Sequence, residues 1–178
     1  MIKSELAKKI YAAAYLTGDF LLRSGQRSTE YFDKFMFNSD PKILAEIAEG
    51  MSELIPQETD VIAGLEMGAI PVVTALSIET GRKCAFVRKT AKEYGTCKLA
   101  EGMAIDGKKV CVIEDVVTTG GQQLASVKEL RARGAEIDTV LCVILRNEAA
   151  HEAFTAEGLT LVPLFTMDYI KKETAKLS

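Results

Sequence analysis

The sequence predicts an α/β protein with a mostly parallel central sheet flanked by helices. The apolar runs within residues 60–64, 109–115 and 136–145 are continuous, and polar residues do not alternate with them. Continuous apolar strands are typical of sheets that are buried on both faces. Helical patterns separate these runs along the chain, and such an alternation produces a parallel sheet with helices on each side.

Length and composition favour one globular domain over residues 1–178. The chain is 48% hydrophobic and 26% charged, which is an ordinary balance for a protein with a substantial core. Its net charge of −3 offers no basic surface of the kind that binds nucleic acid. No apolar run has the length of a membrane span. We therefore expect neither nucleic acid nor membrane as a partner.

The cysteines indicate a reducing compartment. Cys84, Cys97, Cys111 and Cys142 are scattered, and none forms a C-x-x-C pair. The N-terminus lacks the layout of a signal peptide. We therefore expect reduced thiols in a cytoplasmic protein, with Cys111 and Cys142 in the core because they lie inside apolar runs.

The N-terminal part, residues 1–40, predicts a small lobe beside the main sheet, which we call the hood. Residues 1–16 have the pattern of an amphipathic helix, and residues 19–25 and 29–37 resemble short strands around a turn. A further helix should begin within residues 38–51.

The start of that next helix is marked by its capping residues. Ser39 or Asp40 is the expected N-cap, and Pro41 suits the first turn because its missing N–H would have no partner there.

The rest of the chain alternates strands and helices. The predicted strands are residues 60–64, 84–87, 109–115, 136–145 and 159–164. The predicted helices are residues 69–80, 120–134 and 147–158. Gly134 is the expected stop signal of the second of these helices.

The stretch VCVIEDVVTTGGQ, residues 110–122, is the strongest functional signal. Two acids, Glu114 and Asp115, stand at the carboxyl end of a predicted strand, where ligands bind in open parallel sheets. A glycine-rich turn and a helix N-terminus follow, and such an N-terminus attracts phosphate. Carboxylates would repel that phosphate, so we expect them to face ribose hydroxyls, a metal ion or positive charge developing on a sugar ring.

This stretch resembles the 5-phosphoribosyl pyrophosphate (PRPP) signature of the type I phosphoribosyltransferases. The resemblance implies the fold of that family with a small N-terminal hood, acids that hold the ribose hydroxyls, and a loop that wraps the 5′-phosphate. The PRPP-binding residues that it implies are Arg88, Lys89, Lys92, Tyr94, Glu114, Asp115, Val116, Val117, Thr118, Thr119, Gly120, Gly121 and Gln122. It implies catalytic roles for Lys92, Glu114 and Asp115.

Residues 18–35, 86–96 and 145–154 resemble segments of the orotate phosphoribosyltransferases. This likeness implies transfer of the phosphoribosyl group from PRPP to orotate, giving orotidine 5′-monophosphate and pyrophosphate in pyrimidine synthesis. It also implies a homodimer with shared active sites, and Mg²⁺ that is carried by PRPP, with no protein ligand to the metal assigned.

The RKTAK run follows a predicted strand and supplies Arg88, Lys89 and Lys92. Cations of this kind stabilise charge that grows on a pyrophosphate leaving group. In the family, the matching loop closes over the substrate and reaches the partner subunit's site. Residues 88–103 are polar and show no core periodicity, so we expect that they need not pack on their own subunit. Tyr94 stands where the family often has a histidine, and the chain's one histidine, His151, lies elsewhere.

Orotate-binding residues follow from the same resemblance. They are Thr118, Arg146, Arg23, Tyr31 and Phe32. A guanidinium can pair with the orotate carboxylate in bidentate fashion, and an aromatic face can cover the flat base.

Two family positions carry other residues in this chain. Leu145 stands where an acid commonly precedes the matching arginine, and Gly68 stands where some relatives have a lysine in the pyrophosphate-binding loop, here residues 64–71. We expect that loop to make backbone contacts.

Alternative functions remain open at this point. One is transfer to another base, such as uracil or a purine. Another is a non-catalytic regulator that senses PRPP or nucleotides, although Arg88, Lys89 and Lys92 would not be needed for that. A third is a generic Rossmann-like nucleotide binder, against which the absent G-x-G-x-x-G fingerprint argues.

Overall fold

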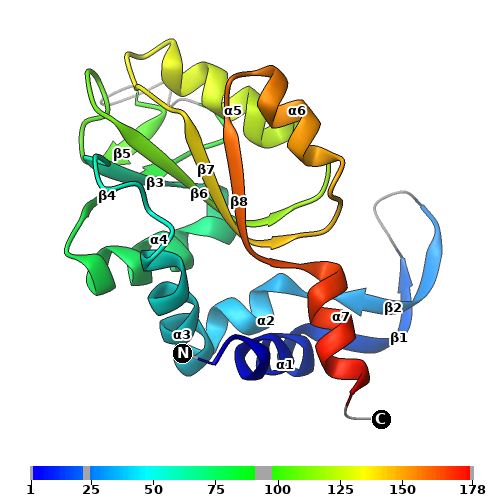
Figure 1. The fold of residues 1–178 in the computed structure, drawn as a ribbon. Helices are drawn as coiled ribbons and strands as arrows, with labels where there is room; N and C mark the ends of the chain where they lie inside the picture. The colour runs from blue at the N-terminus through cyan, green and yellow to red at the C-terminus, as the bar shows by residue number, and fades with distance from the viewer. Residues whose placement is uncertain (1, 22–24, 91–97, 177–178) are drawn as a thin grey trace.

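A six-stranded sheet forms the centre of the molecule (Figure 1). The computed structural model describes residues 2–21, 25–90 and 98–176. The strand order is β5-β4-β3-β6-β7-β8, and every neighbouring pair is parallel except β4 and β5. The strands are β3 (Val61–Leu65), β4 (Lys83–Val87), β5 (Ala100–Gly102), β6 (Val110–Val117), β7 (Thr139–Leu145) and β8 (Thr160–Thr166). The predicted mostly parallel sheet is confirmed.

Helices cover both faces of this sheet (Figure 1). One face carries α5 (Gly121–Arg131) and α6 (Ala150–Ala156). The other carries α3 (Pro41–Ser52) and α4 (Glu66–Thr80), with α1 (Lys3–Ala14), α2 (Lys34–Ser39) and α7 (Met167–Ala175) packed beside them. Within the described ranges, no helix is long and apolar enough to cross a membrane.

Alternation along β6 explains why its sequence is continuously apolar. Cys111 and Ile113 belong to the core under α3 and α4, whereas Val110 and Val112 belong to the core under α5 and α6. Successive side chains of a strand point to opposite faces, so burial of both faces requires apolar residues at every position. Cys111 is buried in the first core and Cys142 in the second, as predicted.

The N-terminal residues form a hairpin beside the helical layer. Strands β1 (Tyr15–Leu21) and β2 (Arg27–Phe32) pair antiparallel. The expectation that the second strand runs to residue 37 is wrong, because Asp33 caps α2 by accepting a hydrogen bond from the Phe35 N–H at 3.0 Å. The first helix also ends two positions earlier than the predicted range of 1–16, at Ala14.

The cap of α3 is Asp40, one of the two residues predicted. Its carboxylate accepts hydrogen bonds from the N–H groups of Lys42 and Ile43, and Pro41 occupies the first turn. Ser39 is instead the last residue of α2, and its hydroxyl donates to the Met36 carbonyl.

Besides α2, two elements have no counterpart in the sequence prediction. Strand β5 closes one edge of the sheet, and α7 packs against α1. Leu99 is buried and its carbonyl accepts a hydrogen bond from the Arg88 N–H at 2.9 Å. The expectation that residues 88–103 need not pack on their own subunit is therefore wrong for residues 99–102, while residues 91–97 lie outside the described part.

Gly64 allows α4 to approach β3 closely. A Cβ added to Gly64 would lie 2.5 Å from Val73 Cγ1 and 3.1 Å from the Ala69 carbonyl oxygen. We predict that Gly64→Ala lowers the free energy of unfolding by about 1–3 kcal/mol, since overpacking forces the helix to shift. Urea denaturation measures this change.

Gly121→Ala is the matched control, because a Cβ there would meet no atom within 4 Å. In a double-mutant cycle, Gly64→Ala should cost less in a Val73→Ala background than in the original protein, because Cγ1 is removed. Equal stability of the Gly64→Ala and Gly121→Ala variants would contradict the close approach.

Candidate active site

A cavity of about 320 Å³ opens at the carboxyl ends of β3 and β6. Its lining residues come from α2, the junction where β3 passes into the first turn of α4, the end of β6 and the start of α5. We call this junction, residues 65–68, the β3–α4 turn. The lining residues are Lys34, Leu65, Glu66, Gly68, Glu114, Val116, Thr118, Thr119, Gly120, Gly121, Gln122 and Gln123. Most of the residues predicted in the 114–122 stretch therefore meet in one place.

The start of α5 presents free backbone donors to this cavity. Gly120 precedes the helix with φ of 82°, and no side chain caps the helix. A Cβ on Gly120 would lie 2.2 Å from Phe154 Cε2. Both the positive φ and this close approach therefore require glycine at position 120. The helix N-terminus and the exposed Thr118 and Thr119 form a site suited to a phosphate.

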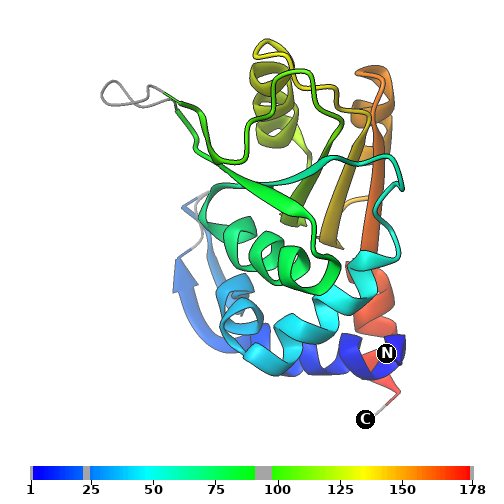
Figure 2. The same cartoon turned by 90° about the vertical axis from the view of Figure 1, so that its left-hand side faces the viewer.

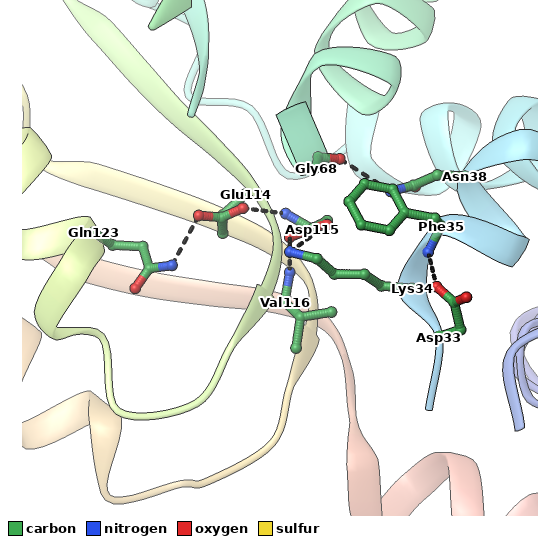
Figure 3. Close-up of polar contacts among 9 residues, drawn as sticks. All are labelled: Asp33, Lys34, Phe35, Asn38, Gly68, Glu114, Asp115, Val116 and Gln123. Carbon is green, nitrogen blue, oxygen red and sulfur yellow. Dashed lines mark hydrogen bonds and ion pairs between the residues drawn. The ribbon is translucent and has the colours of Figure 1, made fainter. Parts of the chain in front are cut away.

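Glu114 points toward α5 and lies in the cavity wall (Figure 3). One carboxylate oxygen accepts from the Asp115 N–H at 2.9 Å and the other from Gln123 Nε2 at 2.8 Å. Burial raises the pKa of Glu114 to about 8, and the Asp115 carboxyl beside it adds to the rise. The hydrogen bonds from Gln123 and the Asp115 N–H oppose this pKa shift without cancelling it.

Asp115 points to the opposite side of β6, toward α2 and α4 (Figure 3). Its side chain is fully buried, and Lys34 Nζ lies 3.0 Å from each of its carboxylate oxygens. Oδ1 also accepts from the Val116 N–H at 2.7 Å, whereas Oδ2 has no hydrogen bond of good geometry. The ion pair with Lys34 is thus the main compensation for this buried charge.

Helix α2 and the β3–α4 turn hold the Asp115 side of the site together. Asn38 donates from Nδ2 to the Gly68 carbonyl at 3.0 Å (Figure 3). A Cβ on Gly68 would lie 2.2 Å from Asp115 Oδ2 and 2.9 Å from Lys34 Nζ. Because glycine is present, the backbone of the turn lies directly against the ion pair.

The β3–α4 turn also carries strain. Glu66 has φ of 59° and is the single non-glycine residue with positive φ in the described ranges. Left-handed backbone at such a residue costs on the order of 1–3 kcal/mol and persists where the surrounding structure imposes it. Both this cavity and the next are lined by Glu66.

A second cavity, of about 540 Å³, lies between this turn and β4. Arg88 and Lys89, both predicted to bind PRPP, line it together with Met67 and Ile70. Arg88 also approaches Glu101 of β5 at 3.7 Å. These cations are therefore placed on the far side of the turn from the start of α5.

A third cavity, of about 300 Å³, brings together Tyr31, Phe32 and Arg146, all predicted to bind orotate. Tyr11, Tyr15, Glu30 and Lys171 are among its other lining residues. The Arg146 N–H donates to the Val117 carbonyl at 2.8 Å, which fixes this pocket beside the end of β6.

Some predicted residues lie elsewhere. Val117 is buried in the core under α5 and α6, so its backbone carbonyl, and not its side chain, faces Arg146. Arg23, Lys92 and Tyr94 lie outside the described residues.

Sequence reasoning missed Gln123 and Lys34. Gln123 follows the quoted motif directly, so extending the motif by one residue would have included it. Lys34 gave no such signal, because it lies 81 positions from Asp115 and appears in the sequence as one more charge after an aromatic pair.

Comparison with known proteins gives a consistent result. The family model described as "Phosphoribosyl transferase domain" matches residues 36–156. An orotate phosphoribosyltransferase of Nocardioides sp. is 48% identical over 165 residues, covering 93% of this chain and 92% of that protein.

Solved structures agree with this match. An orotate phosphoribosyltransferase of Mycobacterium tuberculosis H37Rv in complex with Fe(III) dicitrate has a TM-score of 0.85 at 33% identity, covering 94% of this chain and 98% of that one. A complex of the M. tuberculosis enzyme with PRPP has a TM-score of 0.81 at 30% identity, covering 95% and 98%.

The raised pKa of Glu114 makes a prediction about stability and pH. The folded state favours neutral Glu114, so that stabilisation is present at acidic pH and is lost as pH rises through about 8. Glu114→Gln cannot ionise. Its free energy of unfolding relative to the original protein should therefore increase between pH 5 and pH 9, by on the order of 2–5 kcal/mol.

Urea denaturation of both proteins at a series of pH values measures this difference. A difference between the two proteins that stays constant across the series would show that Glu114 does not titrate in this range.

Proposed function

The chain belongs to the phosphoribosyl transferase domain family and, within it, to the orotate phosphoribosyltransferases, and we propose on that premise that it transfers the phosphoribosyl group of PRPP to orotate. The products are orotidine 5′-monophosphate and pyrophosphate, and the reaction is a step of pyrimidine synthesis. One observation carries the proposal. The cavity of Glu114 and the α5 N-terminus lies at the end of β6, and the pocket of Arg146 lies beside the same strand end.

PRPP fits the order of groups along this edge of the sheet. Its 5′-phosphate is suited to the free N–H groups at the start of α5 and to the hydroxyls of Thr118 and Thr119. The ribose hydroxyls then lie toward the acids Glu114 and Asp115. The pyrophosphate points to the β3–α4 turn, beyond which Arg88 and Lys89 lie.

Orotate is suited to the third cavity. Its carboxylate would pair with the guanidinium of Arg146, while Tyr31 and Phe32 supply aromatic surface for the flat ring. N1 of the orotate anion is the nucleophile, so the protein needs no strong base. Catalysis then comes from positioning the two substrates and from stabilising charge as the C1–O bond breaks.

Mg²⁺ is proposed to enter with PRPP. Among the described residues no group of three or more His, Cys, Asp or Glu side chains could hold a metal ion. Mg²⁺ in proteins is commonly bound by substrate phosphates with one or two carboxylates, and Glu66 and Glu114 line the cavity. When bound, the ion supplies positive charge to the pyrophosphate leaving group.

Transfer to another base is the main alternative. The third cavity is lined by two cations, Arg146 and Lys171, and one acid, Glu30, and this excess of positive charge favours a base with a carboxylate over uracil or a purine. A regulator that only senses nucleotides would not need Arg88 and Lys89 on the pyrophosphate side.

One assay separates these possibilities. Purified protein is incubated with PRPP, Mg²⁺ and, in separate reactions, orotate, uracil, adenine, guanine or hypoxanthine, and pyrophosphate release is followed. Release with orotate alone supports the proposal, release with another base supports the alternative, and no release with any base supports the regulator.

We also propose a homodimer that packs through α4. Met67, Ile70 and Ile78 are exposed apolar residues whose helical spacing places them on one side of α4. Figure 2 shows this helix at the front of the molecule. Met67 and Ile70 also border the cavity of Arg88 and Lys89, so a second copy on α4 would cover that cavity. It stays a prediction that Lys92 reaches into the partner's site. The cytoplasmic location also stays a prediction.

Arg146→Ala should weaken the binding of orotate much more than the binding of PRPP. A hydrogen-bonded charge contributes about 1.5–3 kcal/mol, so the KM for orotate should rise roughly 10- to 100-fold, while the KM for PRPP stays within about threefold. Steady-state kinetics measures both constants. Arg133→Ala, an arginine that pairs with Glu129 on the surface, is the matched control. Equal increases for both substrates would mean that Arg146 does not contact the base.

Ile78→Glu should convert the dimer to a monomer. Ile78 is 81% exposed in the single chain, so a charge there leaves the monomer intact but is unfavourable in an apolar interface. Sedimentation velocity gives the mass, with Glu79→Ala as a nearby control. A dimer that persists in Ile78→Glu would exclude this side of α4 as the interface.

A further inference from the structure

Lys34 is the one cation among the described residues that line the 320 Å³ cavity. The other titratable lining residues, Glu66 and Glu114, are acids. PRPP carries a phosphate and a pyrophosphate, and such a highly charged anion is bound by cations as well as by N–H groups. The cavity therefore has one positive side chain with which to meet a strongly negative substrate.

The position of Lys34 assigns it to one end of that substrate. Its ammonium lies against the β3–α4 turn, since a Cβ on Gly68 would be only 2.9 Å from Nζ. It contacts Asp115, on the side of β6 that faces α2 and α4, whereas the start of α5 lies on the side of Glu114 and Gln123. Lys34 is therefore suited to the pyrophosphate end and not to the 5′-phosphate end.

In the structure the Lys34 ammonium forms an ion pair with Asp115. Nζ lies 3.0 Å from Oδ1 and 3.0 Å from Oδ2, and Oδ2 has no hydrogen bond of good geometry. A buried carboxylate without a partner is strongly destabilising, so Lys34 cannot leave unless another donor replaces it. A ribose hydroxyl is such a donor, because it can donate a hydrogen bond to a carboxylate.

We propose that Lys34 is a pyrophosphate-binding residue that exchanges partners when PRPP binds. In the structure its ammonium neutralises Asp115. When PRPP enters, a ribose hydroxyl donates to Asp115, and the released ammonium donates to pyrophosphate oxygens near C1. This inference rests on the proposed function, because it takes PRPP as the ligand.

The side chain has the freedom that this exchange requires. The Lys34 side chain is 38% exposed while Asp115 is fully buried, so the lysine is the member of the pair that has open space beside it. Lys34 is also the first residue of α2, whose Asn38 binds the Gly68 carbonyl. The backbone of α2 can therefore stay attached to the turn while the ammonium moves.

Binding of PRPP and of ribose 5-phosphate tests the proposal, because both carry the ribose hydroxyls and PRPP alone carries the pyrophosphate. Isothermal titration calorimetry measures PRPP with Mg²⁺ and, separately, ribose 5-phosphate with the original protein, Lys34→Ala and Lys34→Arg. We expect Lys34→Ala to weaken the binding of PRPP roughly 10- to 100-fold, as for a lost charge-assisted hydrogen bond. The binding of ribose 5-phosphate should not be weakened, and Lys34→Arg should recover most of the affinity for PRPP. Lys42→Ala, which removes an exposed lysine of α3, is the matched control.

A second comparison covers the case in which Lys34→Ala does not fold because Asp115 loses its partner. Asp115→Asn and the double variant Asp115→Asn/Lys34→Met both lack the buried carboxylate. The double variant should bind PRPP more weakly than Asp115→Asn, again roughly 10- to 100-fold. Unchanged PRPP affinity on losing Lys34, or equal weakening of PRPP and ribose 5-phosphate, would overturn the proposal.

Failure of this inference is distinguishable from failure of the proposed function. If the original protein releases pyrophosphate only with orotate, yet loss of Lys34 leaves PRPP binding unchanged, then the function stands and the role of Lys34 is wrong. If the original protein shows no orotate-dependent turnover, then the proposed function is wrong whatever Lys34 binds.

Discussion

The end of strand β6 is the constraint on which the site depends. Glu114 and Asp115 are consecutive in a strand that is buried on both faces, so their side chains must enter opposite halves of the molecule. Each carboxyl group must then be compensated on its own side. Helix α5 supplies Gln123 for Glu114, and helix α2 supplies Lys34 for Asp115.

The two solutions differ in their chemistry. Glu114 has a neutral partner, and burial raises its pKa to about 8, so the folded protein favours the neutral carboxyl more than water does. Asp115 has a cation at 3.0 Å and needs it because the side chain is fully buried. The end of β6 thus carries one carboxyl group, Glu114, whose charge depends on pH, and one carboxylate, Asp115, whose charge is compensated by a lysine of α2. The turn at Gly68 lies against the second group and links it to the pyrophosphate side of the site.

Local patterns in the sequence predicted much of this arrangement, and long-range pairing accounts for the rest. The order of strands and helices, the cap at Asp40 and the PRPP motif are encoded in neighbouring residues, so they could be inferred directly. The short α2 was missed because its aromatic residues are typical of a strand. The N-cap formed by Asp33 begins a helix there instead. Strand β5 forms by pairing with β4, and Lys34 pairs with Asp115, which lies 81 positions away. Neither long-range contact is encoded in neighbouring residues.

A crystal structure of the protein with PRPP and Mg²⁺ tests the central claim most directly, because that claim concerns which groups Asp115 and Lys34 contact. The account predicts that a ribose hydroxyl lies within hydrogen-bond distance of Asp115. It also predicts that Lys34 Nζ has moved from its position 3.0 Å from both carboxylate oxygens to contact the pyrophosphate. Lys34 still paired with Asp115 while PRPP fills the cavity would contradict the account.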